Sequence, residues 1–145
     1  MTKRFNIKAD GVRAYMDDNI GIGFITYGGT ITAEATYRTF DWLANLFDQI
    51  TPDELQGIIY DYRAVARFDR TYLSTVQRQY QKLVAKPIAD HPVAIITGSM
   101  YQEKMIRMTQ QLGPPQMAAH TRIVPSMQDA LTYIDAWHNR NEAWI

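Results

Sequence analysis

The stretch that most constrains this 145-residue chain covers residues 55–73. It opens with an apolar, β-branched run at residues 57–60, which is long enough for one buried strand. Charged residues follow from Asp61, and apolar residues then recur at helical spacing from Leu73. The pattern predicts a buried strand that leads into a charged loop and then into the N-terminus of a helix. In an open α/β sheet, ligands and partners bind at the edge formed by the carboxyl ends of the strands, where such loops lie.

Strands and helices alternate on both sides of this stretch. Turn signals and apolar periodicity predict strands over 5–9, 12–16, 20–27, 57–60, 92–97 and 121–124. They predict helices over 32–49, from Asp69 or Thr71 to before Pro87, from Ser99 to about 112, and from Ser126 onward. The order βββαβαβαβα predicts an α/β fold with a mixed sheet, an antiparallel meander followed by parallel strands, and four helices. We expect one domain over 1–145.

Two local patterns make finer predictions. Glycines at 21 and 23 in the third strand leave room for a backbone segment or a helix to approach closely. Ser99 and Gln102 have the spacing of a capping box at the start of a helix. Apolar residues at helical spacing predict the inward face of that helix; they are Tyr101, Met105, Met108 and Leu112.

The composition excludes several classes of function. Fifteen Lys and Arg balance fifteen Asp and Glu without a basic block, which gives no electrostatic case for nucleic acid or an anionic membrane surface. The chain has no cysteine, so disulfides, thiol catalysis and thiolate metal sites are excluded. No secretory signal and no apolar run of membrane-spanning length is present. We therefore expect a cytoplasmic protein without a membrane span.

No pattern predicts catalysis. The three histidines fall in unrelated segments, and neither a nucleophile elbow nor a pair of metal-binding histidines occurs. Asp61 and Asp69 share their stretch with three arginines, whose charge repels a divalent cation. Residues 28–30 (Gly-Gly-Thr) lack the lysine of a Walker loop and fit a simple turn between strand and helix. We expect no enzyme, no cofactor and no metal.

The pattern Tyr60-Asp61-x-Arg63-x-Val65-x-x-Phe68-Asp69-x-Thr71-x-Leu73 resembles the central motif of STAS domains, the SpoIIAA-like family of anti-sigma-factor antagonists. In that family a strand ends in Asp, and an Asp-Ser-Ser/Thr-Gly-Leu segment opens the next helix. The second hydroxyl of that segment is phosphorylated, so the resemblance implies Thr71 as the phosphorylation site. Arg70 and Tyr72 stand where the family has Ser and Gly, so the chain resembles a divergent member.

These patterns together predict a non-enzymatic regulatory or protein-interaction module that acts through residues 67–72. The residues expected to contact a protein partner or an anion are Asp61, Arg63, Arg67, Asp69, Arg70 and Tyr72. This stretch has three arginines and only two aspartates, so pairing each aspartate with one arginine leaves one arginine over. We expect Arg63 to be structural and Arg67 or Arg70 to be exposed and unpaired. The alternative is a small-ligand binding protein with an apolar or anionic ligand held between sheet and helices near Asp61, Arg63 and Tyr101.

Large apolar groups outside the predicted core suggest self-association. Trp42, Trp144 and Ile145 are not assigned to the core by periodicity. If the helices crowd onto one face of the sheet, as the resemblance implies, the other face is only partly covered. Tyr60 and Tyr62 then contribute to a pocket or a dimer contact, and we expect a homodimer.

Overall fold

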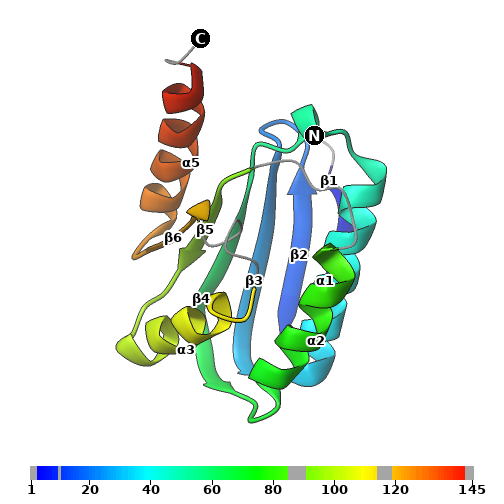
Figure 1. Cartoon of the computed structure of the whole chain (residues 1–145), viewed down its shortest axis with the longest axis vertical. Helices are drawn as coiled ribbons and strands as arrows, with labels where there is room; N and C mark the ends of the chain where they lie inside the picture. Colours follow the sequence, from blue (N-terminus) through cyan, green and yellow to red (C-terminus); the bar gives the residue numbers. More distant parts are fainter. Residues whose placement is uncertain (1–2, 10, 85–90, 114–118, 143–145) are drawn as a thin grey trace.

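The computed structural model describes all residues except 1–2, 10, 85–90, 114–118 and 143–145. Six strands form one sheet in the order β1-β2-β3-β4-β5-β6 (Figure 1). The antiparallel meander consists of β1 (Lys3–Ala9), β2 (Val12–Asp17) and β3 (Ile22–Ile31). The parallel part continues from β3 through β4 (Gly57–Phe68), β5 (Val93–Ile96) and β6 (Thr121–Val124). The predicted mixed α/β sheet is confirmed.

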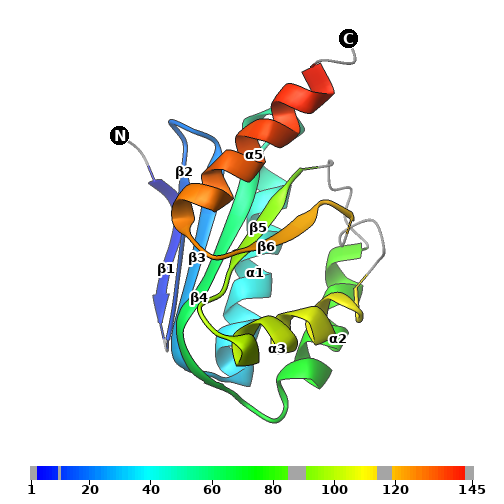
Figure 2. The ribbon, with the colours of Figure 1, turned by 90° about the vertical axis from the view of Figure 1, so that its left-hand side faces the viewer.

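The described part of the chain contains four α-helices, as predicted. They are α1 (Ala33–Gln49), α2 (Tyr72–Val84), α3 (Met100–Gln110) and α5 (Met127–Glu142), with a short 3-10 helix, η1 (Pro52–Glu54). Side chains of α1, α2 and α3 pack on one face of the sheet, and those of α5 pack on the other. Figures 1 and 2 show α5 apart from the other three helices. The helices therefore do not all crowd onto one face.

Alternate residues of the central strands enter two separate apolar clusters. Ile58 and Ile95 belong to the cluster under α1, α2 and α3, whereas Ile59 and Ile96 belong to the cluster under α5. Successive side chains of a strand point to opposite faces, and both faces of these strands are covered. This double burial explains why the strands appear in sequence as continuous apolar runs.

The packing of α1 confirms one sequence prediction and corrects another. The Thr32 hydroxyl accepts a hydrogen bond from the amide of Ala35 and caps the helix. The Trp42 ring packs over Gly23, where a Cβ atom would lie only 3.1 Å from the ring. The expected close approach of a helix at this glycine is thus confirmed. The assignment of Trp42 outside the core was wrong, since this side chain is buried, and Trp144 and Ile145 lie outside the described residues.

Strand β4 is much longer than predicted. It continues past Asp61 as far as Phe68, and β3 continues beside it to Ile31, which pairs with Phe68. The predicted charged loop and the predicted turn at residues 28–30 are therefore both strand. Gly29 has a φ of 68° next to a shift in the β3–β4 register. Its positive φ serves a strand irregularity rather than a turn.

Candidate functional site

The outer half of β4 has a strand on only one side. Its pairing with β5 ends at Asp61, opposite Ile96, whereas its pairing with β3 continues to Phe68. Beyond Asp61, polar backbone groups of β4 on the β5 side therefore need other partners. Helix α3 supplies them from its first turn.

Two side chains of α3 replace the missing strand. Gln102 is buried and donates through Nε2 to the carbonyls of Val65 at 2.9 Å and Arg63 at 3.3 Å. Its Oε1 accepts from the Gly98 amide at 2.6 Å. The Tyr101 hydroxyl accepts from the Phe68 amide at 3.1 Å. These contacts fix the end of β4, and with it the position of the segment that follows.

That segment is a tight turn into α2 built on Asp69. The Asp69 amide donates to the carbonyl of Ile31 at 2.9 Å, which ties the turn to β3. The Asp69 carboxylate accepts from the amide of Thr71 at 2.9 Å and from its hydroxyl at 3.0 Å. These two hydrogen bonds, together with the charge of Arg70, lower the pKa of Asp69. The turn presents the exposed Thr71 directly before the first residue of α2.

We call residues 67–72 the β4–α2 edge. Arg67 and Arg70 are both exposed on it. Among the described residues, Arg67 has no ion-pair or side-chain hydrogen-bond partner, and Arg70 acts on Asp69 only through its charge. The expectation of an exposed, unpaired arginine is thus met by Arg67.

Tyr72 differs from its predicted role as a contact residue. Its side chain is buried, turns under α2 and packs edge-to-face on Phe68 with the ring centroids 4.9 Å apart. A partner at the surface cannot touch a ring in this position. Because the ring turns inward, it also leaves the neighbouring Thr71 hydroxyl uncovered.

Asp61 and Arg63 form a separate ion pair on β4. The Arg63 guanidinium donates to Asp61 through Nε at 3.1 Å and through a terminal nitrogen at 2.8 Å, and the Arg63 amide adds a third bond at 3.0 Å. Burial works to raise the pKa of Asp61, but these hydrogen bonds outweigh it and lower the pKa. Six residues of strand, roughly 20 Å, separate Asp61 from Arg67. The structure therefore does not bring this pair to the β4–α2 edge, and Arg63 is paired with Asp61.

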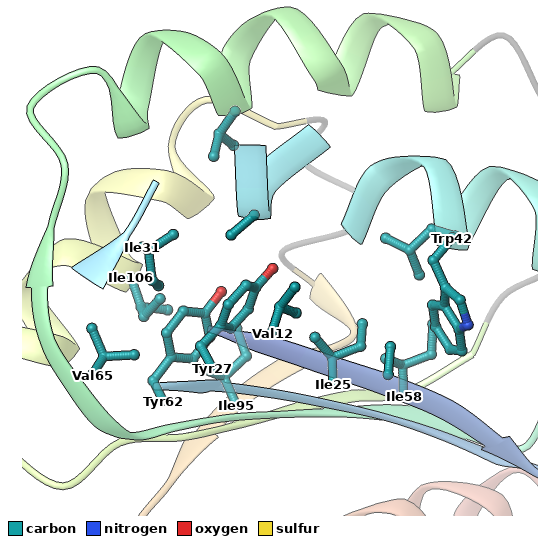
Figure 3. Packing of buried hydrophobic residues seen from close by; sticks show 14 of the residues in the cluster. Val12, Ile25, Tyr27, Ile31, Trp42, Ile58, Tyr62, Val65, Ile95 and Ile106 are labelled. Carbon is teal, nitrogen blue, oxygen red and sulfur yellow. The ribbon is translucent and has the colours of Figure 1, made fainter. Parts of the chain in front are cut away.

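A cavity of about 210 Å³ lies between the sheet and helices α1, α2 and α3. It is lined by five tyrosines together with aliphatic, threonine and histidine side chains; the tyrosines are Tyr27, Tyr60, Tyr62, Tyr72 and Tyr80. Figure 3 shows Tyr27 and Tyr62 rising from the sheet toward the helices. The predicted pocket residues Asp61, Arg63 and Tyr101 do not line it. The pocket between sheet and helices exists, but its predicted position was wrong because Asp61 faces the opposite side of β4 from Tyr60 and Tyr62.

Comparison with known proteins identifies the fold. No protein-family model matches the sequence, and no curated protein does so. An uncharacterized DUF3478-family protein with a SpoIIAA-like fold, from Shewanella loihica, aligns with a TM-score of 0.58 at 15% identity, over 88% of this chain and 98% of its own. An anti-sigma factor antagonist from Mycobacterium paratuberculosis aligns with a TM-score of 0.52 at 16% identity, over 89% of this chain and 99% of its own. The chain has the SpoIIAA-like fold.

Within this SpoIIAA-like fold, the sequence patterns missed what holds the β4–α2 edge in place. Gln102 and Tyr101 were predicted as a capping residue and an inward-facing residue, and both instead bond to the backbone of β4. None of the helices in the described part of the chain is both long and apolar enough to cross a membrane. No group of three or more His, Asp or Glu side chains among the described residues is arranged to hold a metal ion.

Proposed function

We propose that this chain is a non-enzymatic, cytoplasmic regulatory module that docks a protein partner at the β4–α2 edge, with Thr71 as a phosphorylation site. The observation that carries the proposal is the geometry of Thr71. Its hydroxyl is exposed at the start of a helix and held by Asp69, and two exposed arginines, Arg67 and Arg70, come shortly before it in the chain. The SpoIIAA-like fold supports it, because one protein that shares this fold is described as an anti-sigma factor antagonist.

Phosphorylation at Thr71 would reverse the charge of the edge. Two arginines and one aspartate make the edge positive, and a phosphoryl group adds roughly −2. The Thr71 hydroxyl would lose its bond to Asp69, and the phosphate would instead be stabilised by the arginines and by the N-terminus of α2. An acidic partner that binds the unmodified edge would then be repelled.

Affinity capture from the source cells tests the proposal. The parent protein, Arg67→Ala, Thr71→Glu and the control Arg78→Ala are compared by quantitative mass spectrometry of the captured proteins. Arg78 is exposed on α2 but lies outside the edge. We expect at least one captured protein to be lost from both edge variants and kept by the control. Capture profiles that are identical for all four proteins would contradict the proposal.

We also propose that the chain forms a homodimer through the sheet face beside α5. Tyr15 of β2 and Phe24 of β3 stack there with ring centroids 5.2 Å apart, and both are partly exposed. Ile20, in the turn between the same strands, is 47% exposed. Exposed apolar side chains that lie close together in this way favour association. Light scattering at high concentration should return twice the chain mass, and a monomer mass would contradict this assignment.

A further inference from the structure

The tyrosine-lined cavity has the size of a small-molecule site. Its volume of about 210 Å³ exceeds the ~150 Å³ of an apolar protein cavity that binds benzene. It is therefore large enough for one aromatic ring with a short substituent. Aliphatic side chains form much of its wall, including Leu43 of α1, Ile58 of β4, Val76 of α2 and Ile106 of α3.

The lining selects for a neutral molecule. Apart from the two histidines, the described residues around the cavity carry no ionisable side chain other than tyrosine, with no Asp, Glu, Lys or Arg, so no permanently charged group is available to pair with an ion. An unpaired charge buried against apolar walls carries a large desolvation penalty. Aromatic rings suit a ring-shaped ligand, because Tyr27 and Tyr62 already stack at 5.0 Å and Phe40 meets Tyr80 edge-to-face at 5.5 Å.

Within the described part of the chain, two tyrosine hydroxyls of the cavity remain available to a ligand. The Tyr27 hydroxyl donates to Thr39 at 2.6 Å, and the hydroxyls of Tyr62 and Tyr72 are hydrogen-bonded to each other. The hydroxyls of Tyr60 and Tyr80 have no hydrogen-bond partner among the described residues. Burial raises the pKa of both, so both stay protonated and can donate.

We propose that the cavity between the sheet and helices α1, α2 and α3 binds a neutral, single-ring aromatic molecule with a hydroxyl or carbonyl group that bonds to Tyr60 and Tyr80. This site goes beyond the docking function proposed for the β4–α2 edge, and it stands or falls independently of it. The sequence left open whether the ligand is apolar or anionic, and the proposal commits to a neutral aromatic one.

Isoleucine methyl NMR of the full chain tests the proposal, because isoleucines report from both faces of the sheet. Ile58, Ile95 and Ile106 line the cavity, whereas Ile59 and Ile96 pack under α5 and serve as internal controls. The probes are 4-ethylphenol, 4-ethyltoluene of nearly the same shape without the hydroxyl, and the anion 4-ethylbenzoate. We expect 4-ethylphenol to give saturable shifts at the cavity set alone and to bind at least about tenfold more tightly than 4-ethylbenzoate, which must bury its charge.

Conservative variants test the two hydroxyls. The double variant Tyr60→Phe, Tyr80→Phe should weaken 4-ethylphenol binding by about three- to tenfold, the effect of one or two lost hydrogen bonds, and leave 4-ethyltoluene within about twofold. Tyr15→Phe, on the opposite face, should change neither. The proposal is overturned if 4-ethylphenol shows no saturable shift at low millimolar concentration, if the control isoleucines respond instead, or if 4-ethylbenzoate binds as tightly as the phenol. Equal weakening of both neutral probes in the double variant overturns the assigned roles of Tyr60 and Tyr80.

Discussion

The outer half of β4 depends on Gln102, and replacing this residue with alanine should destabilise the protein strongly. The change removes the acceptor of the Gly98 amide at 2.6 Å and the donor to the Val65 carbonyl at 2.9 Å. Gly98 is exposed, so its amide regains water and the lost bond costs about 1 kcal/mol. The hydrogen bond to the Val65 carbonyl is buried, and leaving that oxygen unpaired costs roughly 1–3 kcal/mol. The free energy of unfolding should therefore fall by about 2–4 kcal/mol.

Equilibrium urea denaturation measures this change. Gln128→Ala is the matched control, because Gln128 is exposed on α5 and its loss should stay within about 0.5 kcal/mol. Gln102→Glu keeps an acceptor for Gly98 but cannot donate to Val65 when ionised, so it should be at least as unstable as the alanine variant. A loss below about 1 kcal/mol for Gln102→Ala would refute the reasoning, because α3 would then not hold the strand.

Three further predictions concern stability. Arg67→Ala should leave the free energy of unfolding within about 0.5 kcal/mol in urea, and a larger loss would make Arg67 structural. Gly57→Ala should cost about 1–3 kcal/mol, because the new Cβ would lie 2.9 Å from Ile134 Cδ1 and 3.0 Å from the Pro92 carbonyl oxygen; an unchanged thermal midpoint would contradict this. Stability should be intact below about pH 10 and fall above it, since burial raises the pKa of the cavity tyrosines and the unfolded chain releases their protons first. In an alkaline titration, the absorbance change of the cavity tyrosines should coincide with the loss of far-UV circular dichroism. Complete ionisation of the tyrosines while the protein stays folded would argue against this prediction.

The element order was predictable because each buried element has a local signature. The apolar run at residues 57–60 and the capping residue Ser99 act within a few positions of the chain. The length of β4 was not predictable from such signals. Between Asp61 and Phe68 the strand is half exposed and carries Arg63 and Arg67, so its composition is that of a loop. Only its long-range partners β3 and α3 make it a strand.

The inward face of α3 was predicted only in part, since Met105 packs against the core as expected. Tyr101 and Met108 are exposed, and Gln102, Ile106 and Thr109 are buried instead. Hydrophobic periodicity places glutamine outside, but a buried glutamine is stable when backbone groups satisfy its amide, as Gly98 and Val65 do here. Val65 lies 37 positions from Gln102 in sequence, so no local pattern reveals this partner.

The cavity shows the same limit. Tyr60 and Tyr62 alternate along a strand, and Tyr72 and Tyr80 recur at helical spacing, so each pair is visible in the sequence as one face of an element. Their convergence on one space depends on how α2 sits over β4. Sequence periodicity carries no information on the placement of one element over another, so the cavity could be found only from the structure.

Site-specific photo-crosslinking in the source cells tests most directly whether the β4–α2 edge is the working surface. Benzoylphenylalanine is placed at Arg67 or Arg70 on the edge, and at Arg78 or Gln128 as exposed controls away from it. The account predicts that irradiation joins the two edge variants to another protein and leaves the controls free, and that Thr71→Glu abolishes the product. Crosslinks to the same protein from Arg78 or Gln128, with none from Arg67 or Arg70, would contradict it.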